Sequence, residues 1–102
     1  MPIYLNVGGL VAAGFDPSGH FMLVVSHSGR GVYAVGSWAR VARDLQLAYP
    51  EAGFAVGIGP IAGLLIPIVE MNYQTEDLRW AAPDGSILYY AEGIITLTPP
   101  DA

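Results

Sequence analysis

Runs of apolar residues, separated by short segments rich in glycine and proline, dominate the hydropathy pattern of this chain. The clearest run, Phe21 to Ser26, follows "DPSG" (16–19), in which proline presets one φ angle and glycine can take positive φ. The segment "SGRG" (28–31) can reverse the chain, and Val32 to Val35 can pair back as a second strand. The pattern therefore predicts a β-hairpin.

A similar pattern recurs near the end of the chain. "PDG" (83–85) predicts a turn, Ile87 to Ala91 a strand, Glu92-Gly93 a reversal and Ile94 to Thr98 the returning strand. These residues predict a second hairpin.

The central segment "GFAVGIGPIAGLLIPIVE" (53–70) allows three interpretations. A membrane helix needs about 20 apolar residues, but this density of glycine and proline breaks helices. A phosphate-binding loop would join a strand to a helix, whereas an apolar run follows "GIGPIAG" and the chain has no lysine. We therefore predict two buried strands, Phe54 to Ile58 and Leu64 to Val69, with a turn at Gly59-Pro60 and Pro67 at an edge or bulge.

Only one segment, "SWARVARDLQLAYP" (37–50), shows a helical period. Its apolar stripe consists of Trp38, Val41, Ala42, Leu45 and Ala48. Ser37 can cap the amino end, and Pro50 cannot continue the hydrogen-bond ladder. We predict a helix over 37–49 whose stripe, with Trp38 as its anchor, packs on the sheet.

These elements predict a single α+β domain over residues 1–102. It would have a mainly antiparallel, hairpin-rich sheet of about six or seven strands, with the helix near 37–49 packed on one face. Pro17, Pro50 and Pro83 recur every 33 residues, which suggests three related hairpin units, although eight prolines make chance spacings easy to find.

The order of turn, apolar strand, reversal and "GVYAV" strand, followed by Trp38, resembles one hairpin of a β-propeller blade. A propeller needs about four or more blades, so a chain of 102 residues cannot close one. The resemblance implies blade-like hairpin geometry and no propeller function.

The amino-acid composition indicates what kind of surface the protein has. Hydrophobic residues make up 53% of the chain and charged residues 13%, about half the usual charged share. We expect part of the apolar surface to meet another protein, the alternative being a surface of small and weakly polar residues that needs no partner. A net charge of −5 with four arginines argues against nucleic acid binding.

Residue types and motifs that the sequence lacks bear on its chemistry and its location in the cell. With no cysteine, disulfides and thiolate chemistry are excluded. The first residues, "MPIYLNVGGLVAAG", carry no basic segment of a signal peptide, so we expect a cytoplasmic protein that does not bind membranes. No motif indicates a cofactor, and we predict none.

"SHSGRG" (26–31) is the most chemically suggestive motif. His27 can act as an acid, a base or a metal ligand, or simply make local hydrogen bonds in a turn. His20 would lie at the other end of the same strand, about 23 Å away, so the two histidines are not expected to share a metal. We predict no metal site.

The most polar segment, "EMNYQTEDLRW" (70–80), combines an acidic cluster with residue types enriched in binding hot spots. The predicted binding residues are Glu70, Tyr73, Glu76, Asp77 and Arg79. The plainer interpretation is an exposed loop and edge strand with Trp80 turned into the core.

Two functional hypotheses follow. The first is a non-catalytic interaction module, such as a small acidic inhibitor of the immunity type or an assembly subunit, that binds a protein with a basic site and self-associates. The second is a small enzyme that uses His27 as acid or base with a carboxylate partner. The enzyme requires His27 in a cleft within hydrogen-bond reach of a carboxylate, whereas the module requires a broad exposed patch.

Overall fold

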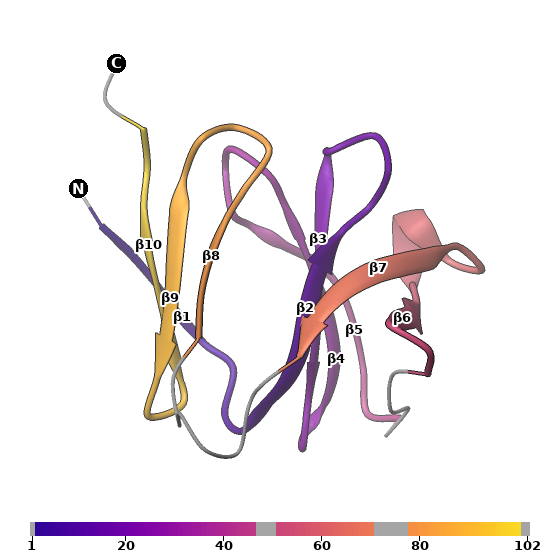
Figure 1. Ribbon diagram of the computed structural model, residues 1–102. Coiled ribbons are helices and arrows are strands. Elements are labelled where there is room, and N and C mark those ends of the chain that lie inside the picture. Colours follow the sequence, from indigo (N-terminus) through magenta and orange to yellow (C-terminus); the bar gives the residue numbers. More distant parts are fainter. Residues whose placement is uncertain (1, 47–50, 71–77, 101–102) are drawn as a thin grey trace.

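The computed structural model of the chain describes residues 2–46, 51–70 and 78–100, which form two antiparallel sheets side by side (Figure 1). The first sheet has the strand order β1-β10-β9-β8 and the second the order β5-β4-β3-β2-β7-β6. The strands are β1 (Ile3–Asn6), β2 (Leu10–Phe15), β3 (Phe21–Ser26), β4 (Gly29–Ala34), β5 (Arg40–Asp44), β6 (Phe54–Val56), β7 (Leu65–Glu70), β8 (Leu78–Ala81), β9 (Ile87–Ala91) and β10 (Ile94–Thr98).

The first sheet buries one face only. Along β9 and β10 the buried residues alternate with exposed or half-buried ones, as expected when one side of a sheet faces solvent. Leu88, Tyr90, Ile95 and Leu97 point into a core that this sheet shares with the second sheet. The predicted second hairpin is confirmed, with its reversal at Glu92 and Gly93.

The first predicted hairpin is confirmed as β3–β4, but its reversal is shorter than predicted. The chain turns at His27 and Ser28, so Gly29, Arg30 and Gly31 belong to β4 and pair with β3. This change places Arg30 within a sheet.

The second sheet is buried on both faces near its middle, because it curls. Met22 and Val24 of β3 pack in the core between the sheets, whereas Leu23 and Val25 pack in a second core inside the curl. This second core contains Ala12, Leu23, Val25, Val32, Ala55, Ile61 and Ile66. Covering on both sides explains why β3 is an unbroken apolar run.

The predicted helix over 37–49, and with it the α+β class, is wrong. The described part of this segment forms a turn and then β5, which pairs with β4. Trp38 has a φ of 59°, in the left-handed region, and therefore cannot begin a right-handed helix. Trp38 is buried as predicted, but Val41 and Leu45 are exposed, so the helical stripe was a coincidence of spacing. In the described residues the fold is all-β apart from one 3₁₀ turn, η1 (Gly59–Ile61).

The central segment forms the two predicted strands, β6 and β7, joined through η1 rather than a tight turn. Ala55 and Ile66 are buried and Ile68 is half-buried, whereas the residues between them are exposed, so the prediction of buried strands holds for one face only. Pro67 pairs with β6 just beyond the β2–β7 pairing, a position that its missing N–H allows. Among the described residues, no helical segment is long and apolar enough to cross a membrane.

Candidate functional site

The structure places two of the five predicted binding residues. Tyr73, Glu76 and Asp77 lie outside the described residues. Glu70 is the exposed last residue of β7 and pairs with Ala12 in the second sheet. Arg79 is exposed on β8 in the first sheet, with its guanidinium carbon 5.3 Å from the centroid of the Tyr89 ring. These two residues thus stand on different sheets.

His27 lies exposed at the tip of the β3–β4 hairpin. Its backbone N–H donates to the Gly9 carbonyl at 2.9 Å, and its ring lies against Gly9, where any β-carbon would collide with it. Within the described residues the imidazole makes no hydrogen bond or ion pair with a carboxylate. The geometry required by the enzyme hypothesis is therefore not found in this part of the chain.

Asp16 lies at the opposite end of β3 from His27. Both oxygens of its carboxylate accept hydrogen bonds within its own turn. Its Oδ1 accepts hydrogen bonds from the backbone N–H groups of His20 (3.0 Å) and Phe21 (2.8 Å). Its Oδ2 accepts from the backbone N–H and the hydroxyl of Ser18. Burial raises the pKa of Asp16, but these hydrogen bonds outweigh burial and lower it below its usual value. The role of Asp16 is structural.

An apolar surface lies on the outer face of β6–β7. Phe54 pairs with Pro67 and Val56 with Leu65, and directly opposed residues of an antiparallel pair share one face. Val69, two residues after Pro67, extends the same face. We define the outer face as these five residues, all of which are exposed.

The free edge of β6 is closed. The N–H and carbonyl of Phe54 both bond to the backbone of Glu51, at 3.0 and 2.8 Å. Nη1 of Arg30 donates to the Val56 carbonyl at 3.3 Å. With these groups occupied, an additional strand has little to pair with, so a partner would meet the face of β6–β7 rather than its edge.

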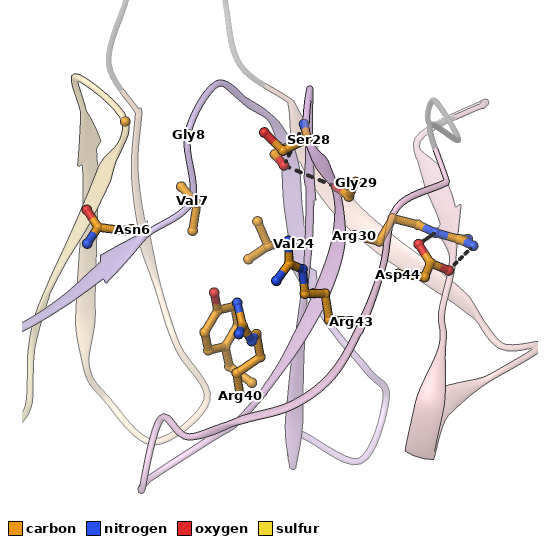
Figure 2. A pocket seen from close by; sticks show the side chains of 14 residues that line it. Asn6, Val7, Gly8, Val24, Ser28, Gly29, Arg30, Arg40, Arg43 and Asp44 are labelled. Atoms are coloured by element: carbon orange, nitrogen blue, oxygen red, sulfur yellow. Dashed lines mark hydrogen bonds and ion pairs between the residues drawn. The ribbon is translucent and has the colours of Figure 1, made fainter.

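A cavity of about 270 Å³ lies elsewhere, where β4 and β5 approach the β1–β2 connection. Three of the four arginines in the chain contribute to its wall. Figure 2 shows Arg40 and Arg43 on one side of β5, and the Arg30–Asp44 pair on the other side.

Sequence reasoning missed both features. It assigned Arg40 and Arg43 to the polar side of a helix that does not form, and the outer-face residues to buried strands. The segments that form β6 and β7 contain only apolar residues and proline until Glu70, so no alternation distinguished their two faces. The low content of charged residues was the one signal that pointed to an exposed apolar surface.

Comparison with known proteins yields no relative: no protein-family description matches the chain, and neither a curated protein nor a solved structure matches it significantly.

Proposed function

We propose that this protein is a non-catalytic interaction module that contacts protein through the outer face of β6–β7, and that its first partner is a second copy of the chain. The observation that carries the proposal is the pairing of Phe54 with Pro67 and of Val56 with Leu65 on an exposed, uncharged face. Such contiguous apolar patches typically mark sites of association.

Exposed apolar residues of the first sheet do not form a comparable patch. Tyr4 stands opposite Thr96, and Ile87 stands opposite Thr98 and Ala81. Ile94 stands opposite Asn6 and Ala91. Each of these residues thus has a small or polar residue directly opposite it, so they form no cross-strand pair of large apolar residues. The contrast selects the outer face of β6–β7.

The distribution of charge around the outer face is compatible with a twofold contact between the outer faces of two chains. Glu51 and Glu70 stand toward the Phe54 end of the face, whereas at the Val56 end the Asp44 carboxylate is neutralised by Arg30, which also donates to the Val56 carbonyl. An isologous contact brings identical patches together, and an antiparallel arrangement would keep the two acidic ends apart.

The other predicted roles remain predictions. A basic partner for the segment from Glu70 to Arg79 is untested, as are an inhibitor role and a cytoplasmic location. We do not propose the enzyme alternative, because His27 gains no carboxylate partner among the described residues.

Sedimentation velocity over a range from low to high micromolar concentration tests the proposal. We expect the wild-type chain to associate reversibly with increasing concentration. Leu65→Glu, which places a charge within the contact, should shift the equilibrium to monomer, because burying an unpaired charge is costly.

Tyr4→Glu is the matched control, since it makes the same kind of change at an exposed residue, 64% accessible, of the other sheet. It should associate like the wild type. A wild-type chain that stays monomeric throughout, or equal loss of association in the Tyr4 and Leu65 variants, would contradict the proposal.

A further inference from the structure

We propose that the arginine-lined cavity binds a small anion that presents two or more negatively charged oxygens, as a phosphate compound or a polycarboxylate does. This site is separate from the outer face of β6–β7, and none of the described residues of the predicted binding segment belongs to it.

A β-bulge brings the two arginines together. On β5, Arg43 pairs with Gly31, Ala42 with Val32 and Arg40 with Tyr33, so Val41 is an extra residue without a partner. In a regular strand, Arg40 would share a face with Ala42, inside the curl. The extra residue instead turns Arg40 to the face that carries Arg43, and re-aiming side chains in this way is a common role of bulges near functional sites.

Glycines provide the space. Gly29 and Gly31 alternate with Tyr33 along the face of β4 that looks toward the first sheet, and all three line the cavity. A β-carbon at Gly31 would lie 3.6 Å from the Tyr33 ring and 3.8 Å from Cδ of Arg40. Larger side chains at this position would therefore fill the volume between the tyrosine and the arginine.

The charges of Arg40 and Arg43 are uncompensated within the described residues. Among the described residues of the cavity wall, Asp44 is the only acidic one, and it is already paired with Arg30, with Nε–Oδ1 and Nη2–Oδ2 distances of 3.2 and 2.6 Å. Arg30 also holds the pKa of Asp44 below its usual value, more than offsetting the effect of burial. In a chain of net charge −5, two unpaired guanidinium groups at one cavity favour an anion between them.

Other lining groups suit a compact oxyanion. Asn6, Ser28 and the Tyr33 hydroxyl can donate hydrogen bonds, and no described residue accepts one from these side chains. The cavity volume of about 270 Å³ is just below the usual range of about 300–1,000 Å³ for small-molecule pockets. The geometry therefore favours a small ligand over a polymer.

Isothermal titration calorimetry and NMR titration of the full chain, with sodium pyrophosphate and with sodium citrate, test the proposal. Sodium chloride at matched ionic strength corrects for screening. We expect saturable binding of at least one anion, and the preferred anion identifies phosphate or carboxylate as the ligand chemistry. Arg40→Gln and Arg43→Gln should each weaken binding about tenfold, because each removes charge-assisted hydrogen bonds.

Two further variants keep the test decisive. Arg79→Gln removes an exposed arginine from the other sheet and should bind like the wild type. Gly31→Val should block binding while keeping both arginines, and circular dichroism would confirm that each variant is folded. The proposal is overturned if neither anion binds saturably, or if Arg40→Gln and Arg43→Gln bind as Arg79→Gln does.

Discussion

In two turns of the chain, an aspartate side chain accepts hydrogen bonds from backbone N–H groups, but the two aspartates differ in burial. Asp16 is buried and accepts from three backbone N–H groups, whereas Asp84 is exposed and accepts from the Ser86 N–H at 2.9 Å. Removing Asp16 would leave several amides without an acceptor in a partly buried turn. The same change at Asp84 would leave a single amide, that of Ser86, without its acceptor.

Asp16→Ala, which removes the acceptor of three backbone N–H groups, should therefore lower the free energy of unfolding by about 1–3 kcal/mol, and Asp84→Ala, which removes the acceptor of one, should lower it by less. Because the folded-state pKa of Asp16 is lowered, its ionised form stabilises the fold above the ordinary aspartate pKa of about 3.9. This stabilisation disappears as the pH falls below about 4 and through the lowered pKa. The free energy of unfolding in urea should be measured between pH 6 and pH 2. It should fall less with decreasing pH for Asp16→Ala than for Asp84→Ala, and equal slopes would contradict the assignment.

Among the elements, the turn before β5 departs most from what the sequence predicts. Trp38 is only 4% exposed and packs in the core between the sheets, although its backbone is left-handed. Its N–H donates to the Ala34 carbonyl at 2.7 Å, and the Ala34 N–H donates to the Ala39 carbonyl at 2.9 Å. The side chain thus anchors a tight turn instead of a helix.

Replacing Trp38 tests both its burial and its backbone. Trp38→Ala should cost about 3–5 kcal/mol of unfolding free energy, the usual cost of truncating a buried aromatic residue. Glycine normally costs about 0.5–1 kcal/mol more than alanine in regular structure, but at positive φ it relieves strain. Trp38→Gly should therefore be no less stable than Trp38→Ala in urea unfolding. A loss below about 1 kcal/mol for Trp38→Ala would contradict the burial of Trp38.

Local signals explain why some elements were predictable. Both β-hairpins were found because turn residues such as Gly19 and Gly85, with φ of 77° and 91°, directly precede the first strand of each hairpin. The assignment of residues 40–44 depended on pairing with β4 and on the bulge at Val41, neither of which leaves a local pattern. The prediction missed the arginine-lined cavity together with this strand, because a helix would have placed Arg40 and Arg43 in solvent.

At the scale of the whole molecule, the strands contribute unequally to the two cores. Strands β2, β3 and β4 contribute to both cores, and the first sheet contributes to the core between the sheets. The β6–η1–β7 unit packs its buried residues, Ala55, Ile61 and Ile66, only in the second core. With its other face exposed, this unit is less buried than β2, β3 and β4, which pack in both cores.

Hydrogen exchange can therefore locate the self-association surface independently. At low concentration, backbone amides in 54–69 should exchange faster than those of β3, because local opening follows weak burial. At high concentration, docking of a second chain on the outer face should stabilise the closed unit and slow exchange in 54–69, since binding favours the state that binds. Peptides covering β9 and β10 should not change. Leu65→Glu should remove the concentration dependence, and slowing confined to β9 and β10 would instead place the contact on the first sheet.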